Sequence, residues 1–566
     1  MTVILAQFLT GLANAASLFL VAVGLSLIFG VTRIVNFAHG SLYMLGAYLA
    51  WTLVHYLDGG ALGFWLGVLL AALGVGLFGL IIELLVLRRI YHAPELFQLL
   101  ATFGIVLVVQ DLVLWLWGPQ DRIGPQVPGL DGAVGFAGTK LPAYDLVLIA
   151  LSPLTLLGLW LLFRRTRWGL LVRAATQDRE MLAALGVNQA WLFTAVFFLG
   201  AALAGLGGAV QLPKGGAHTL LDVNIIATAF VIVVVGGMGS IVGALLASIV
   251  IGELNAFGVL FFPELTLVLM FLAMAVILVL RPQGLLGRAT TVPARTDSGY
   301  APLRPPGWSG QLGWALVLAA LIALPWISQG YTLVLAIELL IAALFAASLH
   351  FMMGPGGMIS FGHAAYFGLG AYGAATLVAH LDAAMIPALL VAPLVGGLGA
   401  LVVGGFCVRL SGVYLAMLTL ACAQITWSAA TQWYALTGGD DGLLGIWPAS
   451  WASDRTHYYY LTLALCGLGI LALRHLIFTP FGYALRAGRD SPARAEAVGI
   501  PVRLRQWQAF TVAGLCAGLA GGLYVFSKGS VFPDVLAIPR SVDALVMVLL
   551  GGVQTLSGPL FGATAY

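Results

Sequence analysis

Charged residues are scarce in this sequence. Only 8% of its 566 residues are Asp, Glu, Lys or Arg, and 61% are hydrophobic, whereas a soluble protein carries roughly 25% charged residues. No soluble fold could cover so much apolar surface, so the lipid bilayer must be the solvent for most of the chain. The 72 glycines fit this, because small residues let membrane helices approach closely. The net charge of +3 is too small to indicate a nucleic-acid partner.

Other features are scarce or missing, and each excludes a class of site. The first charged residue is Arg33, so the basic region of a cleavable signal peptide is missing. The four cysteines lie in apolar stretches without C-x-x-C spacing, so we expect small core residues and no metal site. The Gly-rich runs at 236–243 and 551–558 lack the Lys-Ser/Thr pair of a phosphate-binding loop. The chain is therefore predicted to bind no ATP or other cofactor itself and to be no enzyme.

Apolar stretches long enough to cross a bilayer follow one another along the whole chain. They lie near 6–30, 35–57, 61–87, 96–117, 144–163, 190–212, 239–258, 264–280, 312–328, 331–353, 358–380, 386–408, 412–434, 458–478, 506–526 and 541 onward. The stretch 223–236 is too short to cross unaided and runs into Gly236-Gly237, which predicts a broken or re-entrant segment. The predicted fold class is all-α, a polytopic transmembrane helical bundle.

Clusters of arginine alternate along the chain with loops that are poor in it. The clusters lie near 88–89, 164–179, 281–304 and 474–505, and the poor loops near 118–143, 213–222, 435–457 and 527–540. Cytoplasmic loops carry an excess of basic residues, so the clusters indicate the cytoplasmic side. The other loops are then external, with all three lysines among them, and Met1 is predicted on the external side.

The chain repeats itself. Four blocks return in the same order at offsets of 313 to 324 residues: 36–48 as 360–372, 168–187 as 481–500, 213–215 as 527–529, and 236–243 as 551–558. If the second half only repeated the first, it would cross the membrane in the opposite orientation. The extra apolar stretch 312–328 adds one crossing and reverses that orientation, so the halves are predicted to be parallel. The predicted domains are 1–288, a cytoplasmic linker at 289–311 rich in Pro, Gly and Arg, and 312–566.

Two basic cytoplasmic loops, 164–189 and 479–505, each contain a short segment bounded by helix signals. Asp178 can cap a helix that Gly186 ends, and Ser491-Pro492 can start one that Gly499 ends. A short helix at the same place in both halves predicts docking to two equivalent partners, although a basic loop obeying the charge rule would also fit. The candidate docking residues are Arg173, Asp178, Arg179, Glu180, Gly186, Arg486, Asp490, Arg494, Glu496 and Gly499.

Polar residues inside apolar stretches are candidates for a translocation path, because they are costly in a membrane and usually face a cavity. The candidates are Asn36, His39, Ser360, His363 and Gln424. For the two histidines we favour a structural role at helix ends, satisfying backbone groups. Asp440 and Asp441, in an external Gly-rich run, are candidate docking residues for an extracytoplasmic partner, or part of an ordinary loop.

The repeated blocks resemble the permease subunits of branched-chain amino acid importers driven by ATP-binding-cassette proteins. Residues 36–48 and 281–287 resemble one permease subunit, and residues 360–372, 409–414 and 437–442 resemble the second. This family implies two cytoplasmic ATPase subunits, an extracytoplasmic substrate-binding protein and an amino-acid substrate. It also implies that residues 174–187 and 487–500 are coupling helices, in a multi-pass protein of the bacterial inner membrane working by alternating access.

Two departures from the family are visible. The two subunits are ordinarily separate chains but here are fused, which implies one-to-one stoichiometry. The second half also stops soon after Gly558, about 45 residues short of the matching end of the first, so we expect it to lack a last helix. The resemblance leaves open a permease for urea, short amides or other small solutes. The alternative from another class is an ion-coupled secondary transporter, which inverted repeats and buried acidic coupling sites would favour.

Overall fold

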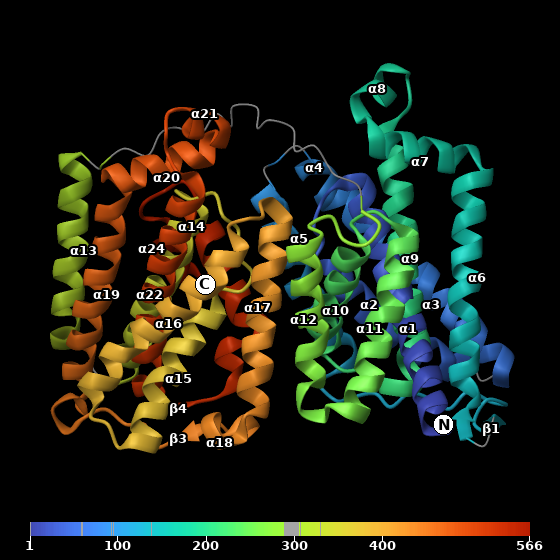
Figure 1. Ribbon diagram of the computed structural model, residues 1–566, viewed down its shortest axis with the longest axis horizontal. Coiled ribbons are helices and arrows are strands. Elements are labelled where there is room, and N and C mark those ends of the chain that lie inside the picture. The colour runs from blue at the N-terminus through green and yellow to red at the C-terminus, as the bar shows by residue number, and fades with distance from the viewer. Residues whose placement is uncertain are drawn as a thin grey trace. The chain divides into compact units, whose positions relative to one another are not determined.

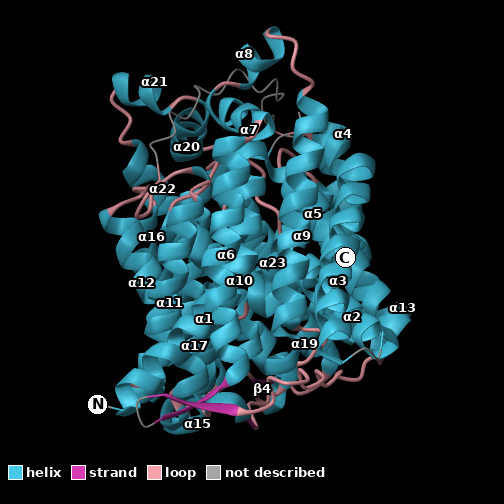
Figure 2. Cartoon of the chain, turned by 90° about the vertical axis from the view of Figure 1, so that its right-hand side faces the viewer, coloured by secondary structure: helices cyan, strands magenta, loops and turns pink. Residues whose placement is uncertain are grey.

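The computed structural model describes residues 2–57, 60–91, 93, 95–136, 139–287, 305, 307–328 and 330–566. Most of the predicted linker, and the side chains of Arg179 and Glu180, lie outside the described part. The chain divides into two compact units, Met1–Ala289 and Thr290–Tyr566. Helices make up almost all of each unit (Figure 1), and the strands, in magenta in Figure 2, are short.

The first unit contains twelve α-helices among its described residues. They are α1 (Thr2–Thr32), α2 (Ala38–Leu57), α3 (Gly60–Ile82), α4 (Arg88–Ile90), α5 (Glu95–Trp117), α6 (Ala143–Arg165), α7 (Arg167–Gln177), α8 (Arg179–Ala184), α9 (Gln189–Gly215), α10 (Leu221–Gly236), α11 (Ile241–Phe261) and α12 (Thr266–Leu280). A π-helical turn, η1 (Glu83–Leu87), joins α3 to α4, and a 3-10 turn, η2 (Pro263–Leu265), precedes α12. The antiparallel hairpin of β1 (Ala133–Phe136) and β2 (Thr139–Pro142) precedes α6.

The second unit repeats this order after one added helix, α13 (Trp308–Ile327). Its other helices are α14 (Tyr331–Met353), α15 (Ala364–Leu381), α16 (Met385–Cys407), α17 (Gly412–Gln432), α18 (Tyr434–Thr437), α19 (Arg455–Ile477), α20 (Pro480–Asp490), α21 (Pro492–Ala497), α22 (Val502–Lys528), α23 (Ile538–Gly551) and α24 (Gly558–Ala565). The 3-10 turns are η3 (Gly439–Asp441), η4 (Ser450–Ala452) and η5 (Pro533–Leu536), and β3 (Leu443–Leu444) pairs with β4 (Ser530–Val531). The added α13 supplies the span on which the predicted parallel orientation depends.

Thirteen helices in the described chain are long and apolar enough to cross a membrane. Together with the repeated order of elements, they confirm the polytopic helical bundle. The stretch expected to start at 541 as one span is broken: α23 ends at Gly551, and α24 begins only at Gly558. The predicted starts at 35 and 358 were also too early, because α2 and α15 begin at Ala38 and Ala364, after buried non-helical segments.

One long helix organises the core of each unit. In the first unit α9 packs against α1, α2 and α3, and in the second α22 packs against α14, α15 and α16. Glycines allow the closest crossings: a Cβ on Gly208 of α9 would lie 1.9 Å from the Tyr43 carbonyl oxygen of α2, and one on Gly521 of α22 1.9 Å from that of Phe367 in α15. The backbones therefore touch where these helices cross, as small residues permit in membrane bundles.

Candidate translocation and docking sites

In the first unit a non-helical segment lies between α1 and α2 and is buried except at Arg33. It covers residues 33–37, and Arg33 begins it with φ of 58°. The Asn36 side chain caps α2, since its Oδ1 accepts the Ala38 N–H at 3.1 Å. The ring of His39, fully buried, lies with Nε2 2.9 Å from the Val21 carbonyl oxygen of α1. For His39 this is the backbone contact that the structural interpretation predicts.

The second unit builds the same turn with other partners. The Ser360 Oγ accepts the Gly362 N–H at 3.3 Å, and the Ala364 N–H that opens α15 donates to Ser541 Oγ of α23 at 2.9 Å. The His363 Nε2 lies 2.7 Å from Ser348 Oγ of α14, so its contact is a hydroxyl and not a backbone group. Gln424 lies half-buried on α17, the counterpart of α5.

An acidic residue that the sequence analysis missed lies beside the first of these turns. The Asp222 carboxylate Oδ2 accepts hydrogen bonds from Ser41 Oγ at 3.1 Å and from Gln110 Nε2 at 3.0 Å. Asp222 is 2% exposed, and the described residues provide it with no salt bridge. The bounds predicted for the loop at 213–222 were therefore too wide, because α9 extends to Gly215 and Asp222 already belongs to the buried α10. A lone acid directly before the short apolar stretch was the signal.

The starts of two helices meet at this buried polar centre. A Cβ on Gly40, in the first turn of α2, would lie 2.4 Å from the carbonyl oxygen of Asp222 in the first turn of α10. Helix N-termini carry partial positive charge, so the Asp222 carboxylate is stabilised there without a cationic side chain. Discontinuous helices whose ends meet inside the bundle are how many transporters build a substrate site.

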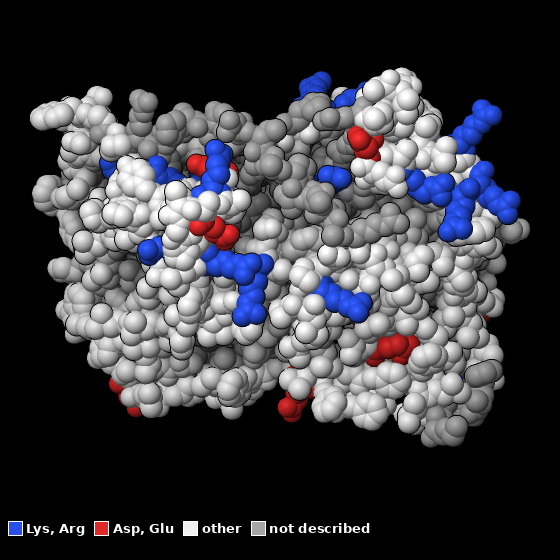
Figure 3. Space-filling view, turned by 45° about the horizontal axis from the view of Figure 1, so that its top comes forward, with Lys and Arg blue, Asp and Glu red and all other residues white. Residues whose placement is uncertain are grey.

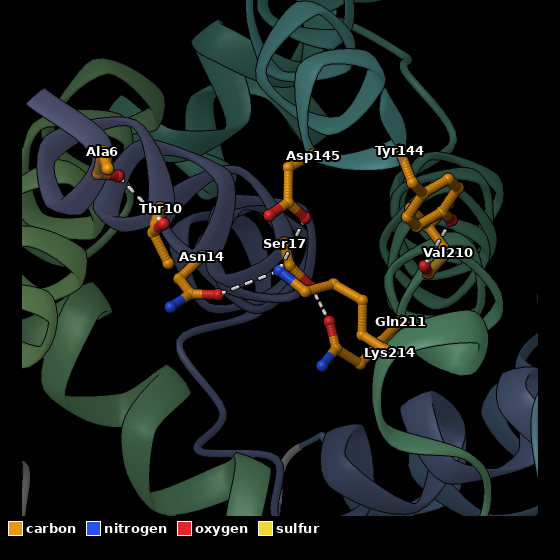
Figure 4. Close-up of polar contacts among 9 residues, drawn as sticks. All are labelled: Ala6, Thr10, Asn14, Ser17, Tyr144, Asp145, Val210, Gln211 and Lys214. Carbon is orange, nitrogen blue, oxygen red and sulfur yellow. Dashed lines mark hydrogen bonds and ion pairs between the residues drawn. The ribbon is translucent and has the colours of Figure 1, made fainter. Parts of the chain in front are cut away.

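At the predicted external end of each unit, a lysine closes the long central helix. Lys214 near the end of α9 lies 3.0 Å from Asp145 Oδ1 of α6 and donates to Asn14 Oδ1 of α1 at 3.2 Å; Figure 4 shows the three side chains converging. In the second unit Lys528 of α22 pairs with Glu338 of α14.

The acidic run of the second unit is a tight turn. Asp440 and Asp441 are exposed on η3, and the Tyr434 hydroxyl donates to Asp441 Oδ2 at 3.4 Å. The run leads into β3, whose pairing with β4 ties it to the end of α22. The two carboxylates are thus presented on a fixed loop, which suits a docking role and an ordinary loop equally.

The two candidate docking segments, α7–α8 and α20–α21, are built alike. Asp178 caps α8 by accepting the Met181 N–H at 2.9 Å, as the sequence predicts. Ser491 occupies the same place before α21 but makes no capping hydrogen bond; Pro492 in the first turn starts that helix. Both helices end on glycines with positive φ, 81° at Gly186 and 85° at Gly499.

Each docking segment exposes an apolar side chain just before its final glycine, a feature the sequence analysis did not single out. Leu185 is 73% exposed, and Val498 at the matching position is 79% exposed. Arg173, Asp490, Arg494 and Glu496 are exposed around them. The expected docking role of Arg486 does not fit its position, because its side chain is buried and stacks on Tyr483, 4.3 Å from the ring centroid.

Each candidate docking segment lies at an arginine-rich end of its own unit. Within each unit they lie at the end opposite to its strands (Figure 1). Figure 3 turns these ends toward the viewer, and basic side chains are visible on each of them. In the first unit this group includes the exposed Arg164, Arg165, Arg167 and Arg173. This agrees with the cytoplasmic assignment from the positive-inside rule.

The model of the family described as "Branched-chain amino acid transport system / permease component" matches residues 7–279 and, a second time, residues 331–566. The chain belongs to this family. It is 30% identical to the high-affinity branched-chain amino acid transport system permease protein BraD of Pseudomonas aeruginosa over 298 residues, which cover 50% of this chain and 96% of the relative. It is 27% identical to the permease protein LivH of Escherichia coli K12 over 297 residues, 50% of this chain and 96% of LivH.

A second kind of relative is LivM of the same organism, 26% identical over 268 residues that cover 42% of this chain and 63% of LivM. The double match confirms two permease repeats fused in one chain, each belonging to a family of transport proteins. With the thirteen candidate spans, it identifies a multi-pass protein of the bacterial inner membrane.

Proposed function

We propose that this chain supplies both membrane-spanning halves of an ATP-driven importer for branched-chain amino acids, working by alternating access. The observation that carries the proposal is the doubled family match, with each matching half holding a buried polar turn and an exposed docking segment. We assign residues 1–288 and 312–566 to the two halves and 289–311 to a cytoplasmic linker. The fusion then sets their ratio at one to one.

The partners in this proposal are two ATPase subunits, one for each docking segment, and a substrate-binding protein outside. The exposed Leu185 and Val498 support the first, because an apolar side chain ringed by charged ones is a typical anchor of a protein interface. The candidate contacts around them are the exposed Arg173, Asp490, Arg494 and Glu496, with Arg179 and Glu180. Asp440 and Asp441 are the candidates for the substrate-binding protein.

The translocation path in this proposal passes the buried polar turns. An amino acid carries an ammonium and a carboxylate. The buried polar turn of the first half offers an acceptor for the ammonium and a donor for the carboxylate. Asp222 is a buried carboxylate without a cationic partner in the described chain. The Nδ2 group of Asn36, at the start of α2, is a buried donor without a partner there. Ser360, His363 and Gln424 line the corresponding path of the second half.

Reconstitution tests the function. Proteoliposomes holding this chain, both ATPase subunits and the binding protein should take up leucine, isoleucine or valine only with ATP. Unlabelled urea and short amides serve as competitors. If they inhibit leucine uptake, the substrate would belong to their class and not to the branched-chain amino acids. Uptake by the chain alone under an ion gradient would show a secondary transporter instead. Reversing the charge of Arg179 or Arg494 should reduce co-purification of the ATPase subunits.

A further inference from the structure

In the second unit one arginine connects the docking segment to two distant backbone turns. Arg489, in the last turn of α20, donates from Nη1 to the Gly354 carbonyl oxygen at 2.7 Å and to Gln554 Oε1 at 3.1 Å. Its Nε and Nη2 face Asp490 Oδ1 at 2.9 and 2.8 Å. The arginine side chain is only 16% exposed, so its contacts to Gly354 and Gln554 are partly shielded from water, whereas Asp490 is 61% exposed. A charged donor held in this way makes stronger hydrogen bonds than a neutral one.

The two turns that Arg489 joins both lead to the buried polar turn of the second half. Gly354 ends α14, and the chain passes from it through Ser360 to the start of α15. Gln554 lies in the turn between α23 and α24, and α23 carries Ser541, which accepts the Ala364 N–H. The turn after α14 is also shaped around the arginine stem. A Cβ on Gly357, whose φ is 65°, would lie 2.5 Å from Arg489 Cγ.

The first half lacks this connection. Thr176 stands at the matching position of α7, is exposed, and donates to the Arg173 carbonyl oxygen of its own helix at 2.7 Å. Gly30 matches Gly354, while Gly239 replaces Gln554. The two turns touch directly in both halves, since a Cβ on Gly30 would lie 3.0 Å from the Cα of Gly239 and one on Gly354 2.5 Å from the Val553 carbonyl oxygen. What the first half lacks among its described residues is the added polar link through an arginine. The first docking segment instead packs through apolar side chains, which form a cluster with residues of α1: Val172, Ala175 and Leu182 with Leu27 and Val31.

We propose that Arg489 transmits movement of the second docking segment to the buried polar turn at Ser360–Ala364. This rests on the proposed function, in which an ATPase subunit moves α20–α21. Arg489 is a positioning residue: it touches no substrate, and it acts by keeping the ends of α14 and α23 attached to α20 when α20 shifts. Arginine suits the task because its planar fork holds several acceptors at fixed angles, which a lysine cannot do. The two halves then respond differently to ATP, the second through a polar link and the first through apolar packing.

The test compares transport with ATP hydrolysis in the reconstituted complete complex. Arg489→Thr installs the residue of the first half; Arg489→Lys keeps the charge without the fork. Gln554→Met removes one partner and leaves the arginine. Arg503→Thr, at an exposed arginine early in α22, removes the same charge from the same face and serves as the matched control.

We expect Arg489→Thr to assemble with the ATPase subunits and to hydrolyse ATP within about twofold of wild type, while uptake falls about tenfold, as for loss of hydrogen bonds from a charged group. Arg489→Lys and Gln554→Met should fall between, and Arg503→Thr should match wild type. Unchanged uptake per ATP in Arg489→Thr would overturn the proposal. So would loss of assembly in both Arg489→Thr and Gln554→Met, which would show a purely structural residue. A wild-type complex without ATP-driven uptake would instead refute the proposed function.

Discussion

Replacing Gly521 of α22 by alanine should separate two helices that now touch. The new Cβ would lie 1.9 Å from the carbonyl oxygen of Phe367, whereas real Cβ atoms essentially never lie under 3.0 Å, so α15 and α22 must move apart by 1.1 Å (3.0 − 1.9). The obstacle is backbone on both sides, so no side chain can rotate out of the way. Overpacking of this kind costs about 1–3 kcal/mol, and we expect the upper end because two long helices must shift together.

The assay is thermal unfolding of the purified chain in detergent. A loss near 3 kcal/mol lowers the Tm by roughly 6–12 °C in a domain of this size. The matched control is Gly467→Ala on α19 of the same unit, where an added Cβ meets no heavy atom within 4 Å. There alanine should leave the Tm unchanged or raise it, because it favours the helix by about 0.5–1 kcal/mol. If both variants melted at the same temperature, the close crossing of α15 and α22 would be wrong.

Three other predictions follow from the site. Leu185→Asp and Val498→Asp should leave the Tm unchanged but weaken co-purification of the ATPase subunits about tenfold, as for interface anchors; normal co-purification would exclude these tips from the interface. Asp178→Ala should speed amide exchange in α8 about fivefold, the effect of losing a capping bond worth ~1 kcal/mol, whereas Ser491→Ala, which removes no such bond, should leave α21 unchanged. Asp222→Asn removes the charge but keeps the side-chain shape, so uptake should fall at least about tenfold while the Tm changes little. If uptake and the Tm both fell strongly, Asp222 would have a structural role only.

The features that the sequence predicts correctly are those with local signals. Scarcity of charge identifies the membrane, and the recurring blocks identify the repeat without any contact being known. The short helix α8 follows from signals that act within a few residues, the Asp178 cap and the Gly186 stop, and the structure places both where expected. The break at Gly236-Gly237 was likewise predictable, because α10 is too short to cross a bilayer.

The features missed by the sequence depend on pairing across long separations. Nothing local shows that Asp222 lies against Ser41, 181 residues away, or that Arg489 reaches Gly354, 135 residues away. Hydropathy also assigns an acid to the loop beside it, so Asp222 was placed outside. For Arg486 the prediction failed in the opposite direction. An arginine in a basic loop is expected to be exposed to water, yet its side chain is buried against Tyr483 of its own helix.

The lysines at the C-terminal ends of α9 and α22 show how two halves of one family can share geometry and differ in chemistry. Asn14 and Glu338 occupy matching positions of α1 and α14, and each contacts the lysine of its own half. Where the first half has the neutral Asn14, the acid is supplied by Asp145 of α6. The lysine therefore keeps a carboxylate partner in both halves, but a different helix holds it. At the other end the two turns touch in both halves, and Arg489 adds a polar link between them in the second half. The helix arrangement of the two halves is thus equivalent, whereas the side-chain contacts that connect the helices differ between them.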